Sequence, residues 1–203
     1  MEESSSAPVV SDREAIADLI HRWAYYRDRG HVDQLRNAFH PDGTICVTWF
    51  EGTYEQFVDA CSKPVAKGDL SKHLMGTPLI RISGNRAVSE VNATICLRRK
   101  IGPVEVDITA YARLVDLLEK RDGTWRISNR TVIYEKDRMD PVRPSLLFWI
   151  MGFFTNLKKY PGAYRYLAYI LERKGGKVAP NIVEDKSEKA ELLYKMADDW
   201  LSG

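Results

Sequence analysis

Apolar side chains near the start of the chain recur at the three- and four-residue spacing of a helix. Ser11 and Glu14 have the spacing of a capping box, which predicts that a helix begins here. The inward stripe of this helix is Ile16, Leu19, Ile20, Trp23 and Tyr26. Gly30 predicts its end, and Asp28 lies close to the stripe in the last turn. The negative end of a helix disfavours a carboxylate, so we expect another group to hold Asp28.

Shorter segments with alternating helical and extended patterns follow. Apolar residues within 32–39 predict a short second helix, and His40–Gly43 has the composition of a turn. Residues 44–49 alternate as a strand that ends at Trp49. The helical spacing of apolar residues in 53–62 predicts a third helix.

The middle of the chain is rich in β-branched and alternating residues. Residues 74–82, 87–98, 104–119 and 125–135 each predict a strand, and short Gly-containing turns separate them. Helices first and then a run of hairpins indicate an α+β fold with a strongly curved antiparallel sheet. Such a sheet, wrapped on the N-terminal helices, forms a cone with one open mouth, which is a natural site for a small molecule.

The last third of the chain predicts a helical C-terminal extension, with helices over 146–158, 163–173 and 187–201. Its most apolar run, Leu146–Phe154, is nine residues long, whereas a membrane span needs roughly 20. We therefore expect no membrane span, and an extension that packs on something as a lid or as an oligomer interface. The expected parts of the chain are a disordered lead-in at 1–10, a cavity domain at 11–140 and the extension at 141–203.

The composition argues against some classes of partner and favours one cellular compartment. The net charge is only +2, so a nucleic-acid partner is not expected. The three cysteines have no C-x-x-C spacing, which argues against a disulfide framework or a zinc site and favours a reducing, cytoplasmic location. We do not expect the acidic, Ser-rich start to act as a secretory signal. No motif implies a cofactor.

Asp28 and His73 are the candidates for chemistry inside the cone. His73 stands at the start of a predicted strand and is followed by the apolar Leu74 and Met75. A carboxylate beside a histidine fixes its tautomer and stabilises the imidazolium, as a proton-transfer base near neutral pH requires. The remaining histidines fall in turns or on a polar helix face, so we expect no metal site; they are His21, His31 and His40.

Several motifs carry a family resemblance over roughly residues 11–136. The stretches Trp23–Gly30, Val32–Leu35 and Phe39–Gly43 resemble the opening of SnoaL-like proteins of the nuclear transport factor two-like superfamily. The resemblance continues at His73–Pro78 and at Asp122–Arg130. Within the superfamily the pattern is similar to scytalone dehydratase, bile-acid 7α-dehydratase and hexachlorocyclohexane dehydrochlorinase.

The resemblance implies roles for individual residues. Asp28 would orient His73, His73 would remove a proton β to a leaving group, and Arg130 would assist that group. The alternative for Arg130 is a surface or interface salt bridge. Where several relatives place a tyrosine acid, this chain has Trp23, although Tyr26 lies one turn later. No second histidine follows on the strand over 87–98. One face of that strand offers Asn92, Thr94 and Cys96, which can hydrogen-bond a substrate but donate a proton weakly.

Three functions remain open at this point. The first is a cofactor-independent lyase or isomerase, dehydratase-like, in which His73 and Asp28 act on a small hydrophobic cyclic metabolite held by Trp23, Tyr26 and Trp49. The second is a biosynthetic cyclase or rearrangement enzyme that uses cavity shape. The third is a non-catalytic small-molecule-binding or assembly module. We expect a homo-oligomer, a dimer or a trimer, with the apolar extension as either its interface or a lid on the cavity.

Overall fold

A computed structural model describes residues 11–62 and 69–203; the expected lead-in at 1–10 lies outside the described residues. The first helix, α1 (Asp12–Arg29), begins at the predicted capping box, in which the Ser11 side chain accepts from the Glu14 N–H and the Glu14 side chain bonds back to Ser11. Gly30 ends the helix in the left-handed conformation at φ 68°. Both helix signals in the sequence are thus confirmed, because caps are local interactions.

Two further helices and two short strands follow α1. Helix α2 (Val32–Arg36) leads into β1 (Phe39–Val47), which pairs with β2 (Phe50–Thr53), and α3 (Tyr54–Cys61) comes next. The turn predicted at His40–Gly43 is wrong, since these residues lie within β1. The pairing of β1 with β7 shifts register between Phe39 and Thr44, so Pro41 and Gly43 occupy an irregularity in a strand.

The sheet is built around three long strands, β5 (Arg86–Ile101), β6 (Val104–Arg121) and β7 (Thr124–Pro141), joined by tight hairpins. The main path runs β2-β1-β7-β6-β5-β3, where β3 is Leu70–Met75, and β4 (Leu79–Ser83) also pairs with β5. Most pairs are antiparallel, whereas β1 runs parallel to β7. The single strand predicted over 74–82 is two strands, so His73 lies inside β3 and does not begin a strand.

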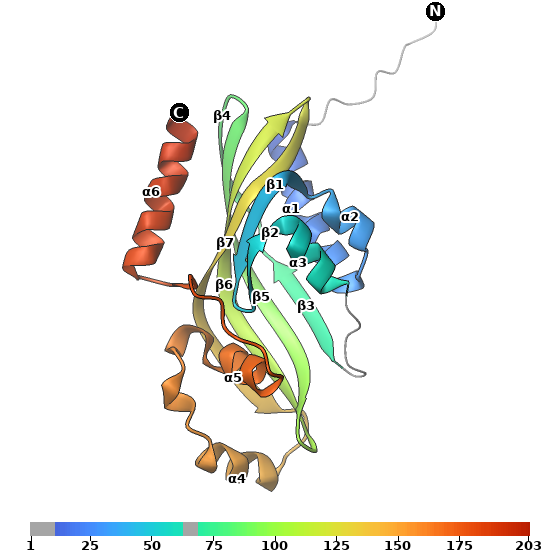
Figure 1. Cartoon of the computed structure of the whole chain (residues 1–203), viewed down its shortest axis with the longest axis vertical. Coiled ribbons are helices and arrows are strands. Elements are labelled where there is room, and N and C mark those ends of the chain that lie inside the picture. Colours follow the sequence, from blue (N-terminus) through green and yellow to red (C-terminus); the bar gives the residue numbers. More distant parts are fainter. Residues whose placement is uncertain (1–10, 63–68) are drawn as a thin grey trace, which may run out of the picture.

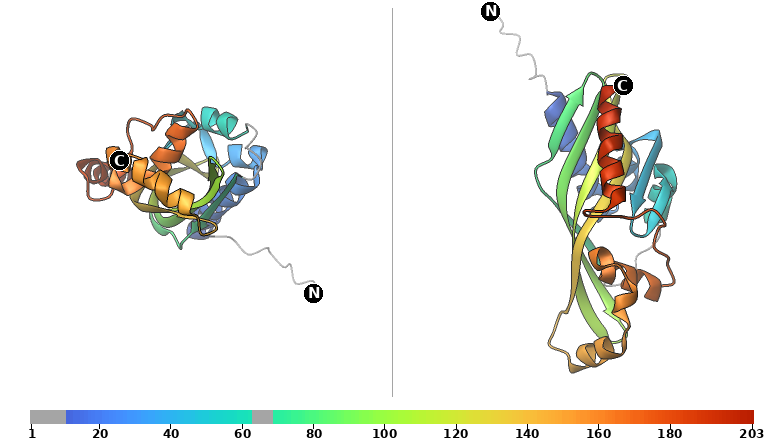
Figure 2. Two further views of the ribbon diagram at one scale, coloured as in Figure 1. Left: turned by 90° about the horizontal axis from the view of Figure 1, so that it is seen from below. Right: turned by 90° about the vertical axis from the view of Figure 1, so that its left-hand side faces the viewer.

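The sheet curves around one side, where α1 and α3 cover it (Figures 1 and 2). The main core lies on this concave side and includes Ile16 and Ile20 of α1, Phe57 of α3, and Leu114 and Leu118 of β6. The α+β class and the curved sheet wrapped on N-terminal helices are therefore as the sequence indicated.

The three helices of the C-terminal extension, α4, α5 and α6, each contact a different part of the molecule. Helix α4 (Leu146–Phe154), followed by a single 3-10 turn at Leu157–Lys159, lies at the far end of the long strands (Figure 1) and leaves Trp149, Phe153 and Phe154 largely exposed. Helix α5 (Arg165–Arg173), which follows the 3-10 turn Gly162–Tyr164, packs on the concave side. Phe148 and Met151 of α4 are partly buried and pack against the main core, so α4 contacts the rest of the molecule through one side only. The homo-oligomer stays a prediction, and α4 offers an exposed apolar surface for it.

The third contact is made by α6 (Glu188–Ser202), which lies along the convex side of the sheet (Figure 2). Two small apolar clusters join it to the strands: Val115, Ile133, Val183, Ala190 and Leu193 in one, and Val88, Leu117 and Ala197 in the other. The short strand β8 (Val183–Glu184) pairs in parallel with β7 and leads into α6, whose N-cap is Ser187.

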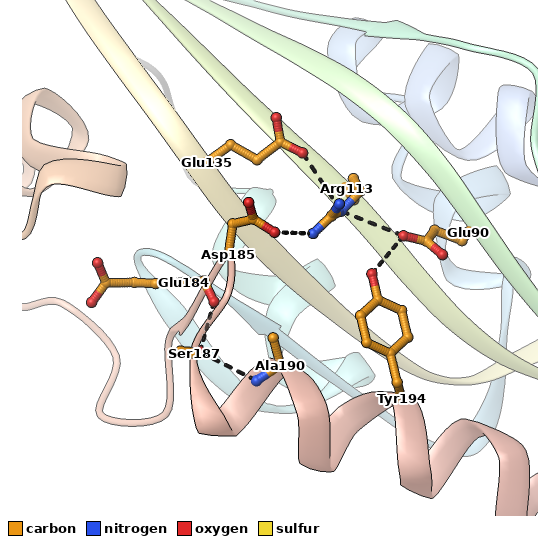
Figure 3. A network of polar contacts seen from close by, with 8 residues as sticks. All are labelled: Glu90, Arg113, Glu135, Glu184, Asp185, Ser187, Ala190 and Tyr194. Carbon is orange, nitrogen blue, oxygen red and sulfur yellow. Dashed lines mark hydrogen bonds and ion pairs between the residues drawn. The ribbon is translucent and has the colours of Figure 1, made fainter.

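A polar network surrounds Arg113 of β6 on the convex face (Figure 3). Its guanidinium donates to Asp185 and lies 3.4 Å from Glu90 and 3.5 Å from Glu135. Tyr194 of α6 donates from its hydroxyl to Glu90 at 2.7 Å. The network therefore ties the segment after β8, and α6 itself, to β5, β6 and β7.

In the described part of the chain, no helix has both the length and the apolar character that crossing a membrane requires. Cys46, Cys61 and Cys96 are free thiols. The cytoplasmic location stays a prediction.

Candidate functional site

A cavity of about 440 Å³ opens on the concave side, between the sheet, α1, α3 and α5. Its apolar walls are Trp23, Val47, Trp49, Phe57, Ala60, Cys61, Ile95, Leu97, Leu114, Val132, Leu167, Ile170 and Leu171. Its polar lining is Arg27, Thr48, Asp69, Ser71, His73, Arg99, Tyr134 and Lys174. A mostly apolar hollow with a few polar groups is typical of a small-molecule site.

Asp28 and His73 meet at the edge of this cavity. Asp28 Oδ1 lies 2.6 Å from His73 Nδ1, and Asp28 Oδ2 accepts the backbone N–H of His73 at 2.8 Å. Both side chains are largely buried, with 5% of Asp28 and 12% of His73 exposed. The carboxylate at the unfavourable helix end is thus held by two hydrogen bonds from β3, the kind of partner that its position requires.

The two bonds fix the orientation of the imidazole. With Nδ1 bound to a carboxylate, the neutral ring carries its proton on Nδ1, and Nε2 keeps the free lone pair. The alternation of β3 turns Ser71 and His73 toward the cavity. Trp23 contacts the imidazole edge-on, with ring centroids 5.8 Å apart. This arrangement can accept a proton at Nε2 and stabilise the resulting imidazolium.

Trp23 and Trp49, two of the expected substrate-binding residues, both line the cavity. Trp49 is 37% exposed and its ring packs 5.2 Å from that of Phe57. The Arg27 guanidinium lies 5.9 Å from each of these two rings. The cavity therefore has an aromatic wall on the side of α3.

Arg130 does not line the cavity, contrary to its expected contact with a leaving group. It is completely buried, and it donates two hydrogen bonds to Asp116 at 2.6 and 2.7 Å. Its guanidinium lies 4.0 Å from the centre of the Trp23 ring, and Trp23 itself lines the cavity. Arg130 does form a salt bridge, but a fully buried one and not the surface or interface pair of the alternative.

Tyr26 and Asn92 are not among the side chains that line the cavity either. On α1, Arg27 follows Trp23 by four residues and lines the cavity with it, whereas Tyr26 packs beside His31. On β5, Ile95 and Leu97 face inward, so alternation turns Asn92 to the outer face, where it is exposed. The inward face of β5 thus supplies apolar groups and Arg99.

Sequence reasoning missed a charged group at the rim of the cavity. Asp69, directly before β3, pairs with Lys174 at the end of α5 and lies 3.6 Å from Arg99. At its other end α5 is held by Asp137 of β7, whose carboxylate accepts the N–H groups of Tyr166 and Leu167. Helix α5 is therefore anchored at both ends as a wall of the cavity. The sequence carries little sign of this anchoring, because the residues of each pair are far apart along the chain.

Thr48 and Tyr134 were missed as well. Thr48 follows β1, and its backbone N–H donates to the Tyr134 hydroxyl oxygen at 2.9 Å inside the wall. The alternation of β7 places Tyr134 on the same face as Val132, and this periodicity could have identified it. Among residues 11–62 and 69–203, no three His, Cys, Asp or Glu side chains gather in a metal-binding arrangement.

Related protein sequences align with this chain over nearly its whole length. Pea pathogenicity protein 2 of Fusarium vanettenii is 32% identical over 203 residues, covering 95% of this chain and 86% of that protein. An uncharacterized protein of Emericella nidulans is 30% identical over 211 residues, covering 96% of this chain and 88% of the relative.

Solved structures share the fold at low sequence identity. A hexachlorocyclohexane dehydrochlorinase of type 2 superposes with a TM-score of 0.54 at 17% identity, covering 66% of this chain and 90% of that one. A protein of unknown function from Mycobacterium tuberculosis gives 0.50 at 18% identity, covering 82% and 91%. A model of the SnoaL-like domain matches residues 8–131. With this match over more than half of its length, the chain belongs to the SnoaL-like family.

Proposed function

We propose that this protein is a cofactor-independent lyase or isomerase, of the dehydratase-like kind, that acts on a small hydrophobic cyclic molecule. The observation that carries the proposal is the double contact of Asp28 with His73 at the cavity edge, at 2.6 and 2.8 Å. It leaves Nε2 of an oriented, largely buried imidazole as the base. One protein of the same fold is a dehydrochlorinase, and elimination is a reaction type that we include in this proposal.

The proposed reaction begins with transfer of a carbon-bound proton to His73 Nε2. The electron pair of the broken C–H bond forms a C=C bond. In a lyase, a leaving group departs from the neighbouring carbon with its bonding pair; in an isomerase, the proton returns at a different carbon. Asp28 stabilises the imidazolium while it exists, because its carboxylate already holds Nδ1.

The walls of the cavity contribute by holding the substrate and excluding water. Trp23, Trp49 and Phe57 offer flat apolar surfaces for a ring. Helix α5 covers the cavity with Leu167, Ile170 and Leu171, and we propose that it acts as a lid. In such a hollow the attraction between the imidazolium and Asp28 is stronger than in water.

The base is tested with nitrobenzisoxazole, a flat apolar probe that reports general-base catalysis. Removal of its ring C–H proton forms a nitrile as the N–O bond breaks, and the oxygen leaves as a coloured nitrophenolate. We expect His73→Ala to lower the rate constant by about 10²-fold, the lower end of the usual contribution of a positioned base. Asp28→Asn should lower it as well, because the imidazole loses its anionic partner.

Arg81→Ala is the matched control, since the pair of Arg81 with Asp198 is exposed and distant from the cavity. Circular dichroism and thermal unfolding would verify that each variant folds. If His73→Ala catalyses the probe reaction as fast as the wild type, the proton-transfer proposal is wrong. The cavity would then act through its shape or as a binding module.

A further inference from the structure

Two arginines, Arg27 of α1 and Arg99 of β5, line a cavity whose walls are mostly apolar. The side chain of Arg99 is 15% exposed, and Arg27 is half-buried. A charged group that leaves bulk water is stable only where an opposite charge or hydrogen bonds compensate it. The partners of these two guanidinium groups therefore indicate what the cavity is built to hold.

Aromatic rings face the charge of Arg27. Its guanidinium lies 5.9 Å from the ring centres of Trp49 and Phe57. Among residues 11–62 and 69–203, no carboxylate pairs with it, and Asp28, the next residue, is turned to His73. A guanidinium over an aromatic ring keeps the N–H groups at its edge available. Arg27 therefore presents hydrogen-bond donors to the cavity.

Arg99 is satisfied on one side of its guanidinium. Its Nη1 donates to the carbonyl oxygens of Leu70 and Arg98 at 2.6 and 2.7 Å. Asp69 lies 3.6 Å from its Nε and also pairs with Lys174, so that two cations share one carboxylate. No group in the described part of the chain accepts a hydrogen bond from Nη2. Arg99 thus keeps an unused donor.

The charges in and beside the cavity do not balance. Three cations line it, and two carboxylates lie in it or at its edge; the cations are Arg27, Arg99 and Lys174, and the carboxylates are Asp69 and Asp28. With a neutral imidazole, one positive charge remains among the described residues. Burial lowers the pKa of Arg99, and the charge of Arg27 lowers it too, against the effect of Asp69. The two guanidinium groups are therefore near enough to repel each other, and one singly charged anion would compensate them.

The register of β3 against β5 sets the separation between Arg99 and the proposed base. His73 lies opposite Ile95, and Arg99 is four residues farther along β5. At about 3.4 Å per residue, the separation along the strand is about 14 Å between Cα atoms. Ser71 and Leu97, which pair with each other, line the cavity between them. A ring system with a substituent at its far end fits this span.

We propose that Arg27 and Arg99 bind a carboxylate at the end of the substrate remote from His73, so that the substrate is a cyclic, largely hydrophobic carboxylic acid. This inference rests on the proposed function and names its substrate class. Arg99 Nη2 and the edge of Arg27 donate to the carboxylate oxygens in charge-assisted hydrogen bonds. The carboxylate takes no part in bond breaking. It holds the ring so that a C–H bond faces His73 Nε2.

The test compares the affinities of 2-naphthoate and 2-naphthamide, which have nearly the same shape and differ in charge. Fluorescence titration measures both at about pH 7, where a carboxylic acid is ionised. We expect wild type to bind 2-naphthoate about tenfold more tightly, the size of one hydrogen bond to a charged group. In Arg27→Met and in Arg99→Met this ratio should fall toward one. The affinity for 2-naphthamide should stay nearly unchanged, because methionine keeps an unbranched apolar stem.

Arg98→Met is the matched control for Arg99→Met. Arg98 precedes Arg99 on β5, and alternation turns it to the other face, where it donates to both oxygens of Asp107 at 2.7 Å. The control loses the same charge outside the cavity, so its ratio should equal that of wild type. Arg27→Met replaces one good helix former by another and remains informative if Arg99→Met folds poorly.

The ratio is read from binding alone, so it is independent of the proton-transfer test on His73. If His73→Ala keeps the full probe rate while the two arginine variants lose the ratio, the base is wrong and the anion subsite stands. A ratio near one in wild type would overturn the subsite. So would a ratio that neither arginine variant lowers, or one that Arg98→Met lowers as much as they do.

Discussion

The two faces of β5, β6 and β7 both bury polar side chains, but the partners of those side chains differ. On the convex face, Arg113 has three carboxylates around it, and Tyr194 donates to one of them (Figure 3). On the concave face, His73 Nε2 and the hydroxyls of Thr48 and Tyr134 have hydrogen-bonding capacity that the described residues leave unused.

The difference separates structural polar groups from candidate functional ones. The convex network holds α6 on the sheet through its ion pairs and the Tyr194 hydrogen bond, although Arg113 Nε makes no hydrogen bond in the described part of the chain. A buried polar group without a partner costs stability, and proteins tolerate that cost at sites that bind a ligand. The concave groups that line the cavity and keep unused hydrogen-bonding capacity are therefore the candidates for the site, whereas the paired Arg130 and Asp116 and the Arg113 network are part of the scaffold.

The largest loss of stability is expected on the concave face, where a polar side chain that is paired and fully buried loses its partner. Asp116→Ala leaves the Arg130 guanidinium without its carboxylate, and both side chains are 0% exposed. We expect a loss of about 3–5 kcal/mol in the free energy of unfolding, measured with urea. Arg138→Ala, which removes an exposed pair with Asp140, should cost less than about 1 kcal/mol. Equal losses in the two variants would contradict this assignment of Arg130.

A smaller change in the free energy of unfolding is expected when one hydroxyl group is removed from either face. Tyr194→Phe removes a hydrogen bond to Glu90 and should cost about 1 kcal/mol in the free energy of unfolding. Thr48→Val removes a hydroxyl oxygen that no described group bonds, so its stability should stay within about 0.5 kcal/mol of wild type or exceed it. Thermal and urea unfolding measure both. A larger loss for Thr48→Val than for Tyr194→Phe would break the comparison of the two faces.

The smallest effect concerns Asp137, a concave group that is only half paired. Its Oδ2 accepts two N–H groups of the α5 segment, its Oδ1 has no described partner, and burial raises its pKa. The folded protein thus binds this proton more tightly than the unfolded chain does. The resulting stability is fully present below the ordinary pKa of about 3.9 and is lost as the pH rises through the raised value.

Asp137→Asn removes this titration and keeps an acceptor for the helix N–H groups. As the pH rises through the raised pKa of Asp137, wild type should therefore lose stability relative to Asp137→Asn. Urea unfolding at several pH values measures the difference. A difference that does not change with pH would show that the two hydrogen bonds cancel the effect of burial on this pKa, and a change of opposite sign would show that they outweigh it.

The sequence predicted the Asp28 side of the candidate site well, and its other residues poorly. The capping box at Ser11 and the end at Gly30 fix α1, so the position of Asp28 at an unfavourable helix end followed from local pattern. Tyr26 and Asn92 were placed wrongly, because a stripe or an alternation defines two sides without saying which side the cavity occupies. Arg130 needed its partner, Asp116, on the neighbouring strand.

By itself the sequence determined the elements, since helix caps, periodicity and hairpin turns act between residues a few positions apart. Only the tertiary structure decided which groups meet, because strand register and sheet curvature bring together residues that no local pattern connects. Asp28 contacts His73 across 45 positions, and Thr48 contacts Tyr134 across 86. The enclosed side of the sheet, and with it the chemistry of the cavity, follows from that packing.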